Sequence, residues 1–449
     1  PTSNSNGEAQ MPAAFIKNLY KLFPGLSISD DIIDQKPKEV NNPRDAFLYI
    51  MRAVSDNAMR ENAHLLARFY KGNEYLSSRL PMVARAMEYK KNQPKLTLES
   101  ARLLYNDYHS YSVSKINAYA ACPFSYYLKY GLKVREQQVW QIQKFDIGSL
   151  LHWAVCEYCK EADGDAETFE ETKKRWHELT DKKSLEIIDK LVDEISQRVL
   201  TGLNRDKEKI FYLIERLRKI LIRSTDIIRL SLTKGEYSAV CYEEKFSVDI
   251  SWNEKKVGIN GTIDRIDAAE NIGSGELALR IIDYKSGSKK FDVVAISNRE
   301  DMQLAVYAIA ATELYKKGAL GHAAKGLQPA VRGVLYNKLR SDLVPCKEND
   351  ICNIDSVIRN SMKPDGVIIV DDGNEISAAV QMDNDIENGG TSSFLKLAIN
   401  SKGDALNKNS SSYMMSDKFR ILTDDVRKTV VNLDEEIFSG RIDILPGKI

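Results

Sequence analysis

Two short segments, GTIDRID at residues 261–267 and IIDYKSG at residues 281–287, indicate the core of the fold that this chain adopts. Their flanks are rich in Ile and Val and partly alternate, and the connection between them is rich in Gly, Asn and Ser. This pattern predicts two antiparallel strands joined as a hairpin. Paired positions in such a hairpin sum to a constant, so folding about residues 273–274 places Asp264 opposite Asp283.

Asp283 and Lys285 are two residues apart, so their side chains project from the same face of the strand. Together with Asp264 they would place two carboxylates and one ammonium on one patch of a sheet. Like charges that oppose each other directly destabilise a sheet, and a bound divalent cation is the natural compensation. Oxygen ligands of this kind suit Mg²⁺. The alternative is a solvated hairpin with an ordinary ion pair, since a lone Asp-x-Lys also arises by chance.

This constellation resembles the PD-(D/E)XK nuclease superfamily and, within it, the RecB-like nucleases. The resemblance implies an α/β fold with a restriction-endonuclease-like core, in which helices flank a mixed central sheet and helical insertions are accommodated. It also implies that Asp264 and Asp283 are metal ligands and that Lys285 is the lysine of the Asp-x-Lys motif.

Two predicted helices carry further motifs of that family. In GSLLHWAVCEYC, the apolar spacing suits a helix with Gly148 and His152 one turn apart on one face. In the strongly helical stretch at residues 300–318, Gln303 and Tyr307 are neighbours in the same way. The resemblance implies that His152 binds the metal as a neutral imidazole, and that Gln303 and Tyr307 line the DNA channel beside it. Taken alone, a structural His and a core Tyr with Gln at its rim are the alternatives.

The stretch YSVSKINAYAACPFSYYLKYGLKV, at residues 111–134, resembles the start of the nuclease domain in the AddB family, the B subunits of bacterial ATP-dependent helicase/deoxyribonucleases. Ser112 and Ser114 are good residues for capping the N-terminus of the helix that follows. The resemblance implies that Cys122 is the first of four ligands to a 4Fe-4S cluster. Later segments keep the order of the AddB elements, so the resemblance covers about residues 97–449.

The three other cluster ligands of the AddB family are missing from this sequence. They are expected in a C-terminal group just beyond the last matching segment, and a cluster of this kind needs four cysteines. We therefore expect no such cluster in this chain, which we interpret as a piece cut from a longer polypeptide before the cysteine group or as a family member that lost it. The cysteines that do not match are Cys156, Cys159, Cys241, Cys346 and Cys352.

These anchors predict two parts. Residues 1–96 form a helical segment from a helicase-like part or its linker, and residues 97–449 form the nuclease domain with a helical insert at about residues 167–232. No Walker A motif occurs, so we expect no ATP site. No apolar run reaches the roughly 18 residues of a membrane span, and no secretory signal opens the chain. We therefore expect a cytoplasmic protein without a membrane partner.

Lys plus Arg and Asp plus Glu each number 64, so the net charge is zero and any DNA site must be a local basic patch. The best candidate is a long amphipathic helix at residues 207–230, whose basic face could bind phosphates without regard to sequence. A merely solvated face is the alternative. Glu244, on a strand before the hairpin, either points toward the metal or protects a sheet edge. The candidate DNA contacts are Arg216, Arg218, Lys219, Arg223 and Arg265.

The predicted function is phosphodiester hydrolysis assisted by Mg²⁺, for which Mn²⁺ can substitute. The two aspartates and His152 hold the ion, Lys285 orients water or stabilises developing charge, and Gln303 and Tyr307 position the strand. The resemblance implies single-stranded DNA from an unwound duplex as substrate and an AddA-type helicase/nuclease subunit as partner in processing double-strand breaks. The alternatives are a Cas4-type RecB-like exonuclease, which is usually much shorter, and a catalytically silent structural or DNA-binding module of the same fold.

Overall fold

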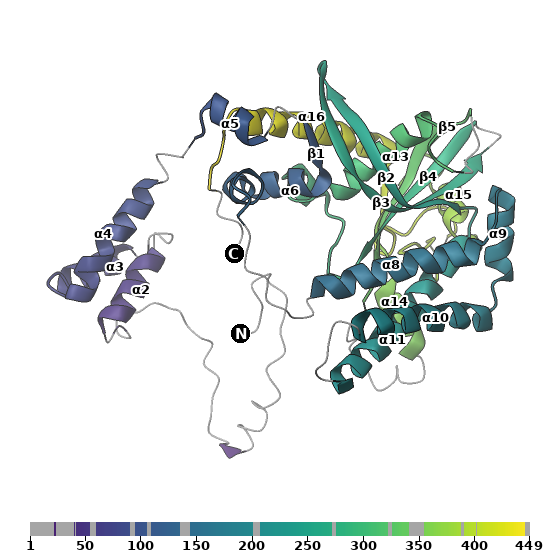
Figure 1. Cartoon of the computed structure of the whole chain (residues 1–449), viewed down its shortest axis with the longest axis horizontal. Coiled ribbons are helices and arrows are strands. Elements are labelled where there is room, and N and C mark those ends of the chain that lie inside the picture. The colour runs from purple at the N-terminus through teal and green to yellow at the C-terminus, as the bar shows by residue number, and fades with distance from the viewer. Residues whose placement is uncertain are drawn as a thin grey trace. The chain divides into compact units, whose positions relative to one another are not determined.

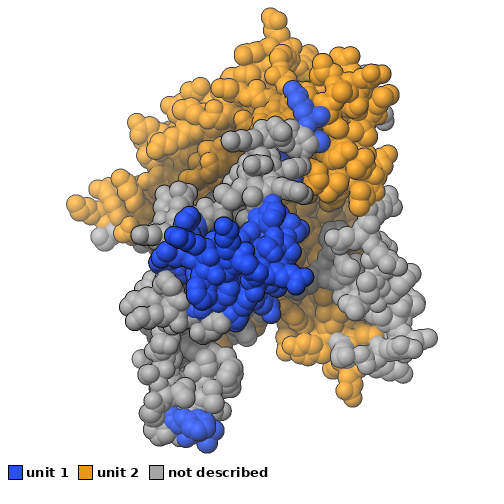
Figure 2. Space-filling model, turned by 90° about the vertical axis from the view of Figure 1, so that its left-hand side faces the viewer, with its two compact units in different colours: residues 1–95, 442–449 blue, residues 96–441 orange. Residues whose placement is uncertain are grey.

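The computed structural model divides into two compact units, residues 1–95 with 442–449 and residues 96–441 (Figure 2). The residues that the structure describes are 22–23, 40, 42–53, 60–89, 95–105, 109–134, 144–200, 207–271, 275–321, 326–340, 354–387, 390–400 and 402–444.

The smaller unit is helical where it is described. Its helices are α2 Pro43–Ala53, α3 Arg60–Phe69 and α4 Glu74–Tyr89. Its small core consists of Tyr49, Ala53, Ala63 and Leu66. Whether this segment comes from a helicase-like part stays a prediction.

The larger unit is built on a seven-stranded mixed sheet, as predicted for the fold class. The strands are β1 Ser110–Ser112, β2 Ser238–Trp252, β3 Lys255–Asn271, β4 Glu276–Lys285, β5 Gln328–Lys338, β6 Asp365–Val370 and β7 Tyr413–Met415. Their order is β1, β3, β4, β5, β6, β7, and β2 pairs with β3. The β2–β3, β3–β4 and β5–β6 pairs are antiparallel, whereas β1–β3, β4–β5 and β6–β7 are parallel.

The predicted hairpin is confirmed with its register. Arg265 pairs with Ile282 and Asp267 with Arg280 in the antiparallel ladder of β3 and β4. Asp264 and Asp283 occupy the next positions of this register, just beyond the last pair. The turn expected about residues 273–274 lies outside the described residues.

Helices cover both faces of the sheet (Figure 1). They are α5 Leu98–Tyr105, α6 Val113–Ala121, α7 Pro123–Tyr126, the π-helix η3 Tyr127–Gly131, α8 Lys144–Asp163, α9 Phe169–Glu178, α10 Asp181–Leu200, α11 Lys207–Thr233, α12 Val293–Ser297, α13 Gln303–Lys316, α14 Ile354–Met362, α15 Glu375–Met382, the 3₁₀-helix η5 Asn384–Ile386 and α16 Ser416–Phe438. Ser112 caps α6 as predicted, since its side chain accepts the backbone N–H of Lys115. None of the described helices combines the length and the apolar character needed to cross a membrane.

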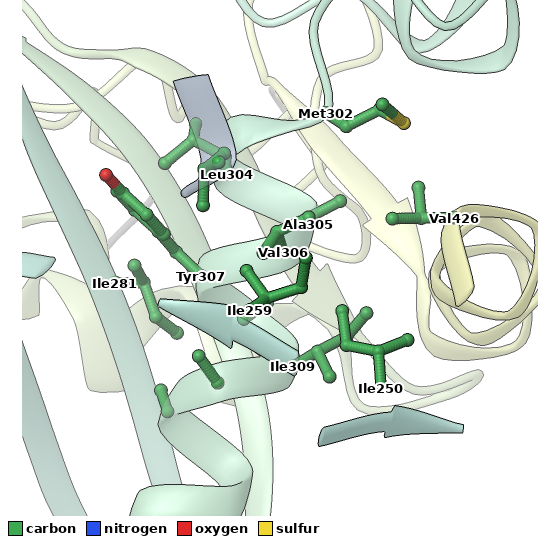
Figure 3. Close-up of a cluster of buried hydrophobic side chains, with 14 of the residues drawn as sticks. Ile250, Ile259, Ile281, Met302, Leu304, Ala305, Val306, Tyr307, Ile309 and Val426 are labelled. Atoms are coloured by element: carbon green, nitrogen blue, oxygen red, sulfur yellow. The ribbon is translucent and has the colours of Figure 1, made fainter. Parts of the chain in front are cut away.

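Two hydrophobic cores, one on each face of the sheet, fix the helices that carry the predicted motifs. On β4, Leu279 and Ile281 belong to the core beneath α13 and α16, whereas Ala278 and Ile282 belong to the core beneath α8, α10 and α11. Successive side chains of a strand point to opposite faces, so β4 feeds both cores. Figure 3 shows the first core, with Ile309 of α13 among its residues. The end of β4 therefore lies between α8 on one face and α13 on the other.

Candidate active site

The sheet has a gap where the two predicted aspartates lie. Since β2 pairs along one edge of β3, β1 and β4 share the other edge, where they pair with residues 258–260 and 265–271. Residues 261–264 thus have no strand partner on that edge among the described strands. Asp264 lies in this gap, and its Oδ2 accepts a 2.6 Å hydrogen bond from the backbone N–H of Tyr284. The Asp264 carboxylate thereby accepts the backbone N–H of Tyr284 in place of a backbone carbonyl of β3.

Asp283 is almost fully buried and is held from two sides. Its Oδ2 lies 2.5 Å from the ammonium nitrogen of Lys285, and its Oδ1 accepts a 2.9 Å hydrogen bond from the side-chain amide of Gln303. The same amide donates to the hydroxyl oxygen of Tyr307 at 2.9 Å. The structure thus brings all four of these predicted site residues into one network.

Helix α8 and strand β2 each place one more side chain that can bind a metal next to Asp264. Nδ1 of His152 lies 3.4 Å from Oδ2 of Asp264. His152, Glu243 and Asp264 offer ligand atoms that all lie within 4.8 Å of one another, close enough to bind one metal ion together. The structure therefore joins His152 to Asp264 as predicted, adds Glu243, and leaves Asp283 bound to Lys285 and Gln303 beside this group.

The sequence patterns considered above do not predict that Glu243 belongs to the site, although they suggest its neighbour Glu244 as a residue that points toward the metal. Glu244 pairs with Ile263, so Glu243 is the β2 residue opposite Asp264. Its backbone is left-handed, with a φ of 49°. A usable signal was the Asn253–Glu254 turn, where both residues have positive φ, as in the two-residue hairpin turns that Asn favours. Counting outward from that turn pairs Glu243 with Asp264.

Burial makes the charged forms of these groups costly. Burial, and next the neighbouring Asp283, raise the pKa of Asp264 well above its ordinary range. Burial also raises the pKa of Asp283, although Lys285 opposes the shift. Burial and then Lys285 lower the pKa of His152 to about 4, so the imidazole is neutral at pH 7 and keeps a lone pair for a metal. Carboxylates of raised pKa beside a neutral imidazole fit a divalent cation.

A cavity of about 690 Å³ lies beside the group and is lined by His152, Glu243 and Lys285. Helix α8 approaches the segment after β4 closely here: a Cβ on Gly148 would come within 3.1 Å of the hydroxyl oxygen of Ser286. A larger residue would crowd the side chain of Ser286 at this contact, one turn before His152. The other walls of the cavity include Ser149, Trp153, Cys156, Glu157, Lys160 and Gly287.

Arg265 is fully buried, so the prediction that it contacts DNA is wrong. Its Nε lies 2.8 Å from Oδ1 of Asp267, and its other nitrogens donate to the hydroxyls of Tyr284 and Ser231. Arg280 donates to the same Asp267 from Nε at 2.9 Å and from Nη2 at 2.8 Å. The charge next to Asp264 in sequence therefore belongs to an ion cluster inside the core.

The basic helix forms as predicted, but its charges are partly neutralised. Arg216 and Lys219 are exposed, whereas Arg218 lies 2.6 Å from a carboxylate oxygen of Asp189 on α10. Neither these residues nor Arg223 line the cavity beside His152. DNA binding by this helix stays a prediction.

The cysteines in the described part of the chain are free thiols, and they do not all lie on one element of the fold. Cys122 is a free thiol at the junction of α6 and α7. Cys156 and Cys159 are buried within α8, inside a helix as expected. Residues 346 and 352, the last two cysteines, lie outside the described part. A role for Cys122 as a cluster ligand stays a prediction.

Relatives share the whole length of this chain. It is 29% identical to the B subunit of the ATP-dependent helicase/deoxyribonuclease of Clostridium kluyveri, an alignment that covers 99% of the chain and 38% of the relative. It is 27% identical to the B subunit from Clostridium perfringens, over 100% of the chain and 38% of the relative, and 26% identical to that from Alkaliphilus metalliredigens, over 99% and 38%. The chain thus spans 38% of the length of these relatives.

A family model described as the PD-(D/E)XK nuclease superfamily matches residues 110–447, which include every residue of the site above. The match covers well over half of the chain and contains the sheet, its gap and all the helices named above on its two faces except α5. This chain belongs to the PD-(D/E)XK nuclease superfamily.

Proposed function

We propose that this chain is the nuclease domain of a bacterial helicase-nuclease and that it hydrolyses phosphodiester bonds of single-stranded DNA with Mg²⁺. The proposal includes exonucleolytic processing of double-strand breaks for recombinational repair, in the cytoplasm. The observation that carries it is the group of His152, Glu243 and Asp264, which meet at a gap in the sheet beside a cavity, with Asp283 next to them. The names of the relatives as deoxyribonuclease subunits support the same reaction class.

The donor atoms of the site favour Mg²⁺, with Mn²⁺ as a substitute. Carboxylate oxygens suit both ions, and Mn²⁺ accepts an imidazole more readily. When bound, such an ion would polarise the scissile phosphate and lower the pKa of a water molecule beside it. Glu243, Asp264 and the neutral imidazole of His152 would hold it, and Asp283 lies next to them.

The other residues of the site act through charge and geometry. Lys285 places its ammonium nitrogen 2.5 Å from Asp283, where it can stabilise negative charge that develops on phosphate oxygens. Gln303 holds the other carboxylate oxygen of Asp283 and the hydroxyl of Tyr307, so it connects the site to the side chain that would contact the DNA strand. These contacts within the chain fix the orientation of the dipoles, and preorganised dipoles of this kind cost little to use during the reaction.

We further propose an AddA-type helicase/nuclease as the partner that supplies the single strand. The relatives are named as one lettered subunit of a helicase/deoxyribonuclease, and such a name implies at least one other subunit. The 4Fe-4S cluster of the AddB family would use Cys122 and three cysteines for which this sequence has no residues at the family positions. We propose that this chain, as it stands, binds no such cluster.

The test is degradation of end-labelled single-stranded DNA with Mg²⁺, with Mn²⁺ and with EDTA. We expect cleavage that needs the metal and that falls at least about a thousandfold in Asp283→Ala, because several kcal/mol of charge stabilisation are removed. The matched control is Asp249→Ala, an exposed carboxylate on β2, which should cleave like the wild type. A well-folded wild type that cleaves with neither ion would favour the catalytically silent module.

A further inference from the structure

A second lysine stands behind the residues of the site. The ammonium of Lys289 donates a 2.9 Å hydrogen bond to Oε1 of Gln303 and lies 2.9 Å from Oδ1 of Asp301. It also lies 5.2 Å from the ring centroid of Tyr336, whose hydroxyl donates to Oδ2 of Asp301 at 3.1 Å. None of the motifs above contains Lys289, yet it touches Gln303 directly.

The contacts of Gln303 permit only one orientation of its side-chain amide. An ammonium can only donate hydrogen bonds, so Lys289 must face the amide oxygen. A carboxylate can only accept them, so Asp283 must face the amide nitrogen. The flipped amide would turn its oxygen toward Asp283 and its NH₂ group toward Lys289, which makes both contacts repulsive. By binding the amide oxygen of Gln303, Lys289 therefore keeps the amide NH₂ group turned toward Asp283.

The fixed amide also sets the direction of the Tyr307 hydroxyl. Gln303 Nε2 donates to Tyr307 Oη at 2.9 Å, so this oxygen accepts and its own proton is left to point elsewhere. Burial, and next Asp283, raise the pKa of Tyr307, so the hydroxyl keeps its proton at neutral pH. Tyr307 is 7% exposed, and its phenol lies close enough to Asp283, Asp264 and Glu243 to interact with their charges.

We propose that Lys289 is a positioning residue that sets the polarity of a hydrogen-bond relay, from Lys289 through Gln303 to Tyr307, and that the Tyr307 hydroxyl donates a hydrogen bond to an oxygen of the DNA phosphate. The inference rests on the proposed nuclease function and assigns the contact that orients the substrate. Lys289 acts through Gln303, because its ammonium is already bound by Gln303 and Asp301 and its side chain is only 31% exposed.

The kinetic test compares Lys289→Met, Lys289→Arg and Lys290→Met in cleavage of single-stranded DNA. Lys290 is the matched control, since it is the next residue along the chain and is exposed. In Lys289→Met we expect kcat to fall about tenfold to a hundredfold, the usual effect of removing a residue that orients an active-site group, with KM within about twofold. Lys289→Arg keeps the donor and should restore most of kcat, and Lys290→Met should match the wild type.

A double-mutant cycle tests whether Lys289 works through Gln303. In a Gln303→Met background, Lys289→Met should cause no further loss, because the relay is already broken. A lysine that binds DNA directly gives another pattern: KM rises, kcat is unchanged, the salt slope of binding falls by about one, and the loss persists in the Gln303→Met background. That pattern would overturn the proposal.

A second readout requires neither activity nor metal. In metal-free protein carrying ¹⁵N-labelled glutamine side chains, the NH₂ signals of Gln303 are identified by their loss in Gln303→Met. They should be protected from hydrogen exchange in the wild type and in Lys290→Met, and exchange rapidly in Lys289→Met. Unchanged protection in Lys289→Met would refute the relay. An inactive wild type would count against the nuclease proposal alone, since these signals still decide the role of Lys289.

Discussion

Asp264 and Arg265 are consecutive residues of β3, yet they belong to two charged groups with opposite properties. The closed cluster consists of Arg265, Asp267 and Arg280. The open site consists of His152, Glu243, Asp264 and Asp283. All three residues of the closed cluster are fully buried, and one carboxylate there binds two guanidinium groups. The open site brings three carboxylates together beside a cavity, and Lys285 is in contact with one of them, Asp283.

The difference between the two groups shows how one strand can serve stability and chemistry at once. In the closed cluster each charge has a partner at hydrogen-bond distance, and Arg280 adds a contact over the ring of Tyr237, 4.5 Å from its centroid. In the open site burial raises the pKa values of Asp264 and Asp283, and the nearby Lys285 only opposes the shift. The paired charges of the closed cluster link the two strands, whereas the carboxylates of the open site can bind a cation.

Breaking the closed cluster should have the largest effect on stability. Asp267→Ala leaves the guanidiniums of Arg265 and Arg280 buried without their carboxylate, and removal of one partner from a buried ion pair costs about 3–5 kcal/mol. The measurement is the free energy of unfolding in urea, with Asp249→Ala as an exposed control that should change it by less than about 0.5 kcal/mol. A loss below about 1 kcal/mol in Asp267→Ala would mean that the cluster does not hold the fold.

Removal of a carboxylate charge from the open site should raise the free energy of unfolding, whereas the same change in the closed cluster lowers it. Asp264→Asn keeps the shape of the side chain but removes a charge whose folded-state pKa is raised, so at pH 7.5 the ionised form no longer weighs against folding. In EDTA we expect unfolding at a higher urea concentration than for the wild type. With Mg²⁺ we expect cleavage to fall more than about a hundredfold, or roughly 2.7 kcal/mol. A less stable Asn variant in EDTA would contradict this contrast.

The hairpin and the helices could be predicted because their signals are local. The register follows from a turn-rich connection between two apolar strands, and α8 and α13 follow from apolar spacing over several turns. Asp264, Asp283 and Lys285 needed only that register to be placed together. Gln303 and Tyr307 needed only a helical period, and their hydrogen bond confirms it.

The errors occur where the fold covers both faces of a strand. From Arg265 to Ala269 every residue of β3 is buried, so alternation no longer shows which face a side chain takes. The local pattern therefore places Arg265 on the surface, although it is buried with its partner Asp267, which also binds Arg280 on the next strand. The position of Glu243 opposite Asp264 follows only from a register counted from a distant turn. The neutralisation of Arg218 on α11 follows only from its contact with Asp189 of α10. Both depend on contacts between residues far apart in the sequence, which local sequence patterns do not reveal.

The smallest effect is expected for Asp163, a carboxylate of α8 near the closed cluster. Its Oδ1 accepts a 2.6 Å hydrogen bond from the indole of Trp176, yet burial raises its pKa to about 6. Since this is above the ordinary value of about 3.9 for an unfolded chain, the folded state binds the proton more tightly. Stability therefore falls as the pH rises from about 4 to 6, and the cost is complete above pH 6.

Asp163→Asn keeps an acceptor for Trp176 and removes this titration. At pH 7.5 we expect a gain of about 2 kcal/mol in the free energy of unfolding, after allowing for partial exposure of the side chain. At pH 4.5 the gain should be much smaller, because Asp163 is already protonated in the folded wild type. Urea unfolding at both pH values measures the difference. An equal gain at the two pH values would show that the charge of Asp163 does not affect stability.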